Sequence, residues 1–317
     1  MIVHIIKYYL KSVISLLINN LGGIFFIKCL FRNKSVLLIL NYHNFSLYNN
    51  YKIKRGNILE TGYANNFEKQ IRVYKKHFNF CYPEDFFAGK CDKGINLLIT
   101  FDDGYRDNYD IALPILKKHD AAAVFFITTN AVLKNDYLLH DKIRYLIQKG
   151  LITEKYNKIP TEMYKGSQNY KIEDVAKVEK TFNEKPPNKR LMMTPEEVKE
   201  LSDNGFVIGN HTHSHLALSF FSKEEQKVDI LNADKNLSYI TRKSIKHIAY
   251  PNGLNNENTR RALVHCNYAY GYTINGGPND ENTDKFLLRR IGLNASDSIG
   301  NILLKMFLYS TIKKGKI

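Results

Sequence analysis

Two segments far apart in the chain contain the residue types from which hydrolytic metal centres are built. An apolar run, residues 95–101, ends in Asp102-Asp103-Gly104, and residues 210–215 read Asn-His-Thr-His-Ser-His. Adjacent carboxylates at the end of a buried strand are costly unless a charged group meets them. His211 and His215 have a spacing at which two imidazoles can converge on one metal ion. Together the segments predict a mononuclear metal site with one carboxylate that is not needed as a ligand. This combination of groups is typical of a hydrolase.

Each segment alone has a simpler explanation. An Asp-Asp-Gly sequence after a strand is often only a solvated turn. A His-x-x-x-His pair often lies on the surface or in a small structural site. The catalytic hypothesis therefore depends on the combination of the two segments and on the residues around them.

Further segments surround this pair in a consistent order. They are residues 40–43 (Leu-Asn-Tyr-His), 205–210 (Gly-Phe-Val-Ile-Gly-Asn), 249–253 (Ala-Tyr-Pro-Asn-Gly) and 288–291 (Leu-Arg-Arg-Ile). With residues 100–104 (Thr-Phe-Asp-Asp-Gly) and the histidine segment, they resemble the motifs of the polysaccharide deacetylase family, the NodB-homology carbohydrate esterases. The resemblance covers roughly residues 36–295. The first segment is similar to the opening of the branch that acts on extracellular and lipid-linked glycans.

The resemblance implies a division of roles within the metal site. Asp103, His211 and His215 would be the metal ligands, and Asp102 would be the general base that takes a proton from the activated water. Two histidines and one carboxylate are typical of catalytic zinc, although cobalt and nickel accept the same ligands. Such a metal lowers the pKa of its water from about 15.7 to about 7. His213, between the ligands, is given no catalytic role.

Three further roles follow from the resemblance. The backbone N–H of Asn252 would help to bind the oxyanion, at a position where the family more often has Tyr. The late Leu-x-His that supplies the general acid in much of the family has no counterpart here, so His43 is the candidate acid; the alternative is that His43 only caps a strand. Arg289 or Arg290 would pair with Asp102 and lower its pKa, and the sequence leaves open which of them does so.

Hydrophobic periodicity predicts strands that alternate with helices. Strands are expected at residues 35–42, 95–101, 121–128, 206–209 and 246–250, and helices at 67–78, 108–119, 224–240 and 259–265. Thr194 and Glu197 predict a capping box for a helix that starts at Pro195. The alternation implies an α/β protein with a mostly parallel sheet. The resemblance implies a distorted (β/α) barrel of the NodB-homology type, with the site at the carboxyl ends of the strands.

The expected organisation is one catalytic domain with basic, amphipathic extensions. Residues 35–296 are the expected deacetylase domain, with an insertion at about 135–190 suited to form one wall of the substrate groove; residues 1–34 are a membrane-tending segment and 297–317 a basic tail. Eight Lys or Arg precede Glu60, the first acidic residue, which favours peripheral contact with an anionic membrane. Residues 12–27 are uncharged but short for a bilayer span. A single-pass anchor and an ordinary helix packed on the barrel are the alternatives.

Composition narrows the partners and the location. The net charge of +15 invites a nucleic-acid partner, but the basic residues are scattered and no nucleic-acid recognition motif is present, so we expect none. No signal peptide is convincing. The cysteines lack CxxC spacing and are expected to be reduced thiols; they are Cys29, Cys81, Cys91 and Cys266. We therefore expect a cytoplasmic protein at the inner face of the membrane, with no indication of its oligomeric state.

These observations predict a metal-dependent carbohydrate deacetylase, a hydrolase of linear amide bonds. The expected partner is an N-acetylated glycan, in which the amino sugars belong to a bacterial surface polysaccharide or its lipid-linked precursor. An O-deacetylase would use the same site and differs only in its substrate. A non-enzymatic glycan-binding protein is the alternative from another class, and the spare carboxylate of Asp102 argues against it.

Overall fold

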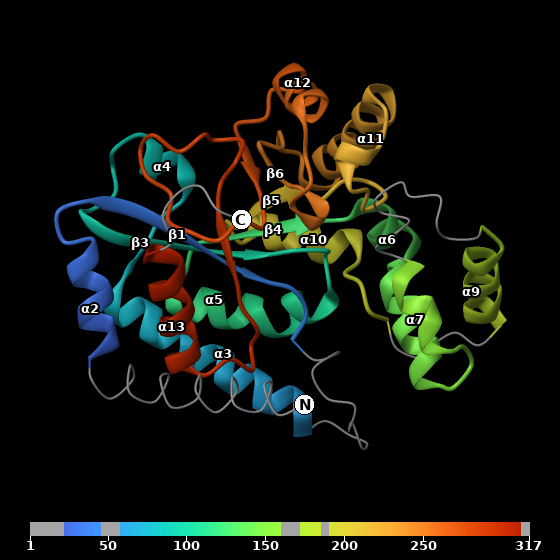
Figure 1. Cartoon of the computed structure of the whole chain (residues 1–317), viewed down its shortest axis with the longest axis horizontal. Helices are drawn as coiled ribbons and strands as arrows, with labels where there is room; N and C mark the ends of the chain where they lie inside the picture. Colours follow the sequence, from blue (N-terminus) through green and yellow to red (C-terminus); the bar gives the residue numbers. More distant parts are fainter. Residues whose placement is uncertain (1–21, 46–57, 160–171, 185–189, 312–317) are drawn as a thin grey trace. The chain divides into compact units, whose positions relative to one another are not determined.

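A computed structural model describes residues 22–45, 58–159, 172–184 and 190–311 (Figure 1). The chain forms two compact units. Unit 1 contains the residues up to Phe101, Asp110–Val124 and the residues from Tyr272 onward. Unit 2 contains Asp102–Tyr109 and Phe125–Gly271. The predicted segment 1–34 lies outside the described residues as far as residue 21.

The sheet of unit 1 is parallel and its central strands are buried. Its order is β2 (Asn79–Phe80), β3 (Gly94–Phe101), β1 (Ser35–Tyr42) and β8 (Arg290–Gly292). All residues of β1 and β3 after the first are buried, which is why both strands have near-continuous apolar sequences. The register pairs Tyr42 with Phe101, at the ends of the two predicted strands.

The helices of unit 1 confirm one sequence prediction and modify another. They are α2 (Gly23–Leu30), α3 (Ile58–His77), α4 (Pro83–Phe87), α5 (Leu113–His119) and α13 (Ile299–Thr311). The predicted helical face at residues 67–78 is confirmed, because Phe67, Ile71 and Tyr74 are all buried on α3. The helix predicted at 108–119 is instead a π-helical turn, η1 (Asn108–Ala112), followed by α5. Pro114 lacks an N–H and its ring opposes a regular α-helical turn before it, which accounts for the break.

Unit 2 repeats the alternation of strands and helices. Its strand order is β4 (Ala123–Ile127), β5 (Val207–Asn210), β6 (His247–Ala249) and β7 (Tyr270–Tyr272); the first two residues of β4 and the last of β7 are assigned to unit 1. The main helices are α6 (Thr129–Lys134), α7 (Leu139–Gln148), α9 (Ile172–Glu184), α10 (Pro195–Asp203), α11 (Lys223–Thr241) and α12 (Glu257–His265). The predicted capping box is confirmed, since Thr194 Oγ1 accepts from Glu197 N and the Glu197 carboxylate accepts from Thr194 N.

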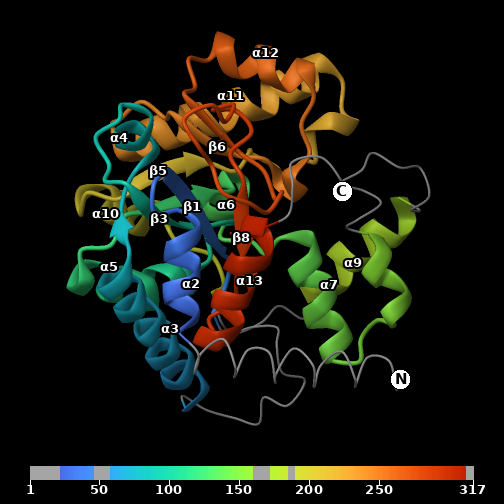
Figure 2. The same cartoon turned by 60° about the vertical axis from the view of Figure 1, so that its left-hand side comes forward.

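The segment predicted to interrupt the alternation forms its own small helical cluster. Helices α7 and α9 lie side by side (Figures 1 and 2), with the short 3-10 helix η2 (Glu154–Lys158) between them in the sequence. Ile143, Leu146, Val178 and Phe182 are buried in a common hydrophobic core. Buried Lys142 pairs with carboxylates on both sides, at 2.6 Å from Asp136 and 2.7 Å from Glu179. The segment is therefore an ordered helical element in the residues that the structure describes.

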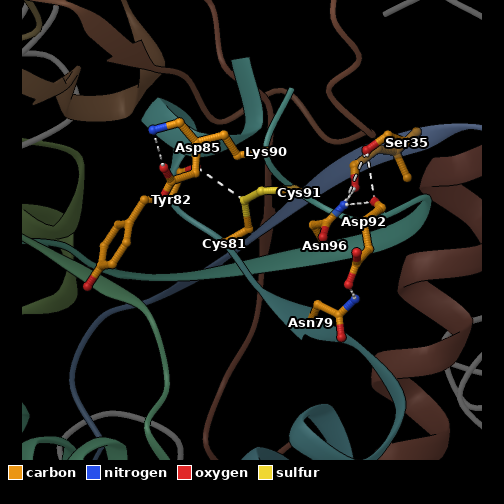
Figure 3. Close-up of a disulfide and its surroundings, with 10 residues drawn as sticks. Ser35, Asn79, Cys81, Tyr82, Asp85, Lys90, Cys91, Asp92 and Asn96 are labelled. Atoms are coloured by element: carbon orange, nitrogen blue, oxygen red, sulfur yellow. Dashed lines mark hydrogen bonds and ion pairs between the residues drawn. A yellow bond between two sulfur atoms is a disulfide. The ribbon is translucent and has the colours of Figure 1, made fainter. Parts of the chain in front are cut away.

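The prediction of four reduced cysteines is wrong for two of them. Cys81 and Cys91 form a disulfide, while Cys29 and Cys266 are free thiols (Figure 3). Asp92, next to Cys91, accepts hydrogen bonds from Ser35, Asn79 and Asn96, and so holds the end of the loop against the strands (Figure 3). The spacing of the cysteines in the sequence could not show that Cys81 and Cys91 lie close enough to form a disulfide. Because disulfides are typical of oxidising compartments, the cysteines no longer support the predicted cytoplasmic location.

Candidate metal centre

The two adjacent aspartates lie in a tight turn directly after β3. Asp103 and Gly104 have φ values of 77° and 90°. A Cβ on Gly104 would lie 3.3 Å from the side chain of Val132, in a conformation that side chains rarely adopt, so glycine suits this turn. The Thr128 N–H donates to the Asp103 carbonyl at 3.3 Å. Both Asp102 and Asp103 are buried.

The histidine segment leaves β5 in a loop that its own polar side chains hold in place. The Asn210 Oδ1 atom accepts from Thr212 N at 2.6 Å, while Asn210 Nδ2 donates to the Tyr268 hydroxyl and to the Ile230 carbonyl. The Asp229 carboxylate accepts from the N–H groups of residues 213 and 214. These bonds stabilise a backbone in which Thr212 and His215 both have positive φ, and they direct two imidazoles inward.

Asp103, His211 and His215 converge at one point within unit 2. Asp103 Oδ1 lies 3.4 Å from His211 Nε2 and 3.2 Å from His215 Nε2, and all three potential ligand atoms lie within 4.8 Å of one another. Ligands about 2.0–2.2 Å from a tetrahedral zinc ion lie roughly 3.3–3.6 Å apart. The two separations between Asp103 and the histidines are close to this range, and one carboxylate oxygen with two imidazole nitrogens is a donor set that suits a divalent metal.

The electrostatics of the two imidazoles differ. Burial lowers the pKa of His211, but the negative charges of Asp102 and Asp103 outweigh it and raise that pKa above the usual 6.5. The pKa of His215 is lowered, chiefly by burial, although Asp103 opposes the shift. A cation at this point would be attracted to two buried carboxylates and would find at least one neutral imidazole.

Comparison with known proteins shows the family of the chain. A family model described as polysaccharide deacetylase matches residues 89–271, more than half of the 317 residues. The chain belongs to the polysaccharide deacetylase family. It is 24% identical over 195 residues to YxkH of Bacillus subtilis, an inferred polysaccharide deacetylase. That match covers 62% of this chain and 50% of the relative, so the chain spans about half the length of that curated protein.

Solved deacetylase structures show the same fold. The deacetylase PplD of Streptococcus pyogenes, in complex with acetate, has a TM-score of 0.58 at 22% identity, covering 86% of this chain and 98% of that one. The polysaccharide deacetylase BC0361 of Bacillus cereus has a TM-score of 0.57 at 16% identity, covering 85% and 68%. IcaB of Ammonifex degensii has a TM-score of 0.51 at 18% identity, covering 86% and 99%. These likenesses confirm the predicted distorted (β/α)-barrel fold of the NodB-homology type.

The remaining predicted site residues of unit 2 lie as follows. Asn252 has a φ of 55° in the turn η4 (Pro251–Gly253), where Gly253 N donates to the Tyr250 carbonyl at 2.8 Å. His213 Nδ1 lies 2.8 Å from Thr129 Oγ1, and His213 is not part of the converging group of ligand atoms.

The other predicted site residues, His43, Arg289 and Arg290, belong to unit 1. His43 is exposed and follows β1. Arg290 is buried and donates from Nε to the Thr273 carbonyl at 2.9 Å and from Nη1 to Asn41 Oδ1 at 2.9 Å. Arg289 is only half-buried. The predicted roles of these three residues stay predictions.

Sequence reasoning missed one histidine beside the metal ligands. The ring of His140, on α7, has its centroid 5.8 Å from that of His215. It is accompanied by Tyr105, which directly follows Gly104, and by Asp141, which is fully buried. Nothing in the sequence pattern connects residue 140 to the motifs, because the contact is made between segments far apart in the chain.

Proposed function

We propose that this protein is a metal-dependent hydrolase that removes N-acetyl groups from amino sugars of a bacterial surface polysaccharide or of its lipid-linked precursor. The observation that carries the proposal is the convergence of Asp103, His211 and His215, with Asp102 buried beside them, on motifs in the order found in the polysaccharide deacetylase family. A glycan-binding module would need no such set. An O-deacetylase is the rival that shares the site.

The proposed site residues of unit 2 have different roles in the hydrolysis of the acetyl amide. Asp103, His211 and His215 would hold the metal, most suitably zinc, with cobalt or nickel as alternatives. When bound, the metal supplies Lewis-acid polarisation of the acetyl carbonyl and lowers the pKa of a water molecule. The carboxylate of Asp102 takes the proton that the attacking water loses. The Asn252 N–H donates to the oxyanion that develops on the carbonyl oxygen.

His43 is the proposed general acid, which gives a proton to the leaving amine. The support for this role is the register of unit 1, which pairs Tyr42 with Phe101. These residues immediately precede His43 and Asp102 in the sequence. Parallel strands in register end at the same level, and catalytic groups in such folds follow the strand ends.

Arg290 is the better candidate to lower the pKa of Asp102. Its guanidinium is buried, and its Nη1 lies 3.4 Å from Thr100 Oγ1, two residues before Asp102 in the sequence. A cation beside Asp102 would favour the ionised form of its carboxylate. Arg289, by contrast, is half-buried and extends along Gly277.

The proposed location is an anionic membrane surface, contacted by α2. Phe25, Phe26 and Leu30 are 68%, 56% and 45% exposed, while Ile27 anchors the helix and is 1% exposed. Helix α13 lies beside α2 and adds exposed Leu308 (Figures 1 and 2). The exposed cations Lys28, Arg32 and Lys34 follow on the same segment. An apolar face with adjacent cations and no acidic residue before Glu60 complements an anionic lipid surface.

The structure describes no helix that is long and apolar enough to cross a bilayer, among residues 22–45, 58–159, 172–184 and 190–311. The uncharged segment that would form a single-pass anchor lies largely outside these residues. The membrane proposal therefore concerns α2 and its neighbours alone. A membrane-bound enzyme would meet a lipid-linked glycan directly, which favours that substrate.

Asp102→Asn tests the catalytic proposal. We expect acetate release from N-acetylglucosamine oligomers to fall by about two orders of magnitude or more, the scale of a lost general base, with metal content unchanged. Loss of metal in this variant would mean that the roles of Asp102 and Asp103 are reversed. Release of acetate from acetyl esters but not from N-acetylated oligomers by the unmodified protein would favour the O-deacetylase.

A further inference from the structure

A polar cluster lies beside the metal ligands in unit 2 and has no part in the mechanism above. It consists of Tyr105, His140 and Asp141. The Tyr105 hydroxyl lies 3.0 Å from Asp141 Oδ2 and 3.1 Å from His140 Nε2. His140 Nε2 is also 3.5 Å from Asp141 Oδ1. The His140 ring in turn lies against His215, with a centroid distance of 5.8 Å and an angle of 54° between the ring planes.

The hydrogen bonds fix which nitrogen of His140 carries a hydrogen. A carboxylate only accepts, so the single hydrogen of the Tyr105 hydroxyl is directed to Asp141. The Tyr105 oxygen can then only accept from His140, and His140 Nε2 must be the donor. The imidazole is thus held in one tautomer and one orientation by two buried partners.

Tyr105 and Asp141 are more deeply buried than His140, which they orient. Tyr105 and Asp141 are 2% and 0% exposed, whereas the His140 side chain is 19% exposed. Burying a carboxylate is costly, and the hydrogen bond that Asp141 accepts from the Tyr105 hydroxyl offsets part of that cost. Arg144 adds a distant contact of 4.0 Å to Asp141, from a half-exposed side chain. Of the three side chains in the cluster, that of His140 is the one partly exposed to solvent.

The cluster joins two parts of unit 2 that are far apart in the sequence. Tyr105 follows the Asp102-Asp103-Gly104 turn, and its backbone is fixed by an antiparallel bridge to Met192. His140 and Asp141 begin α7, the first helix of the segment that interrupts the strand–helix alternation. The Tyr105–Asp141 bond therefore ties that helical segment to the turn that carries the proposed base and a proposed metal ligand.

We propose that His140 is a substrate-positioning residue of the deacetylase site, which contacts the N-acetylated sugar beside His215. An oriented imidazole offers a sugar both a flat face and a polar edge, which suits a hexosamine ring with its hydroxyl groups. Tyr105 and Asp141 position His140 and do not themselves touch the sugar. This inference rests on the proposed function, and it assigns part of the substrate specificity to the inserted helix α7.

Steady-state kinetics of zinc-loaded His140→Ala test the proposal, with an N-acetylglucosamine tetramer as substrate. We expect KM to rise about tenfold, which corresponds to the loss of one good hydrogen bond, while kcat stays within about twofold. Zinc content should equal that of the unmodified protein. His140→Asn keeps a hydrogen-bonding side chain and should recover part of the loss. Gln148→Ala, an exposed position on the same helix, is the matched control and should change neither constant.

A second readout is independent of turnover. In the zinc-loaded Asp102→Asn background, calorimetric titration with the same tetramer should show a Kd about tenfold weaker when His140→Ala is added. An unchanged KM and Kd would overturn the proposal. Loss of zinc, or a fall in kcat at constant KM, would also overturn it, because His140 would then support His215 and not the sugar. If the unmodified protein binds zinc but releases no acetate from the tetramer, the proposed function itself fails.

Discussion

The Nδ1 atom of His211 lies 2.8 Å from the carbonyl oxygen of Ala249. A carbonyl oxygen only accepts, so Nδ1 carries a hydrogen, and in the neutral imidazole the Nε2 lone pair faces Asp103. This is the usual arrangement by which a partner behind a histidine sets its tautomer for metal binding. The bond joins the loop after β5 to the end of β6, so the sheet itself orients the imidazole.

Metal binding should depend on pH in a direction that these contacts define. A histidine must be neutral to bind metal, and the pKa of His211 is raised above 6.5 because the Asp102 and Asp103 charges outweigh burial. As the pH falls, zinc affinity should therefore begin to weaken at a pH above 6.5. In the metal-free protein the same raised pKa of His211 gives folding stability the opposite pH dependence: it stabilises the folded state at low pH, and this contribution is lost as the pH rises through the raised pKa.

Competition with a chromophoric chelator across the neutral and mildly acidic range measures that affinity. Asp102→Asn is the matched control, because removing its charge should move the loss of affinity to lower pH. A zinc affinity that stays constant throughout the range would contradict the account of His211.

His43→Ala should separate proton donation from metal binding. If His43 protonates the leaving amine, kcat for amide substrates should fall by about two orders of magnitude while zinc content is unchanged. Activated acetyl esters have a better leaving group and need less protonation, so they should be affected less. Near-normal turnover of the amide would remove His43 from the mechanism and favour the strand-capping alternative.

The disulfide predicts a definite thiol count. Protein unfolded in denaturant without reductant should show two titratable thiols, from Cys29 and Cys266, and four after reduction. Cys81→Ser should lower the free energy of unfolding by about 3 kcal/mol, the chain-entropy value for a loop of this length. Cys266→Ser is the control and should change stability little. Four thiols before reduction would mean that the pair is not formed.

The exposed face of α2 predicts binding to lipid. The full-length protein should co-sediment with vesicles that contain phosphatidylglycerol and much less with pure phosphatidylcholine, since both apolar contact and charge contribute. Replacing Phe25 and Phe26 together by Ser should weaken binding at least tenfold. Val264→Ser is the control, because Val264 is 62% exposed on α12 of the other unit. Unchanged sedimentation of the double variant would exclude α2 as the contact.

The elements that position the site could largely be predicted from the sequence. The apolar runs at 35–42 and 95–101 are buried strands, and the run before His211 is a short strand, as their composition indicates. The regular helical spacing of Phe67, Ile71 and Tyr74 also predicted burial correctly. Such patterns are local consequences of one buried face, so they can be read without the fold.

Features that depend on contacts between distant segments could not be predicted in this way. The Cys81–Cys91 pair depends on the conformation of the loop between β2 and β3, and the approach of His140 to His215 depends on the packing of α7. Pro114 was visible in the sequence, but the sequence did not show that the chain before it would form a π-helical turn. That turn arises because Pro114 has no N–H with which to continue a regular α-helical hydrogen-bond pattern. The resemblance to the family motifs gave the three candidate metal ligands, but it could not indicate which other side chains lie next to them.

Anomalous diffraction at the zinc edge, from crystals of the zinc-loaded protein, tests the central claim most directly. We expect a single strong peak bonded to one Asp103 oxygen and to the Nε2 atoms of His211 and His215, at about 2.0–2.2 Å. Asp102 should lie beside the peak without binding it. A protein that takes up no zinc, or a peak at which any of these three side chains is not a ligand, would contradict the account.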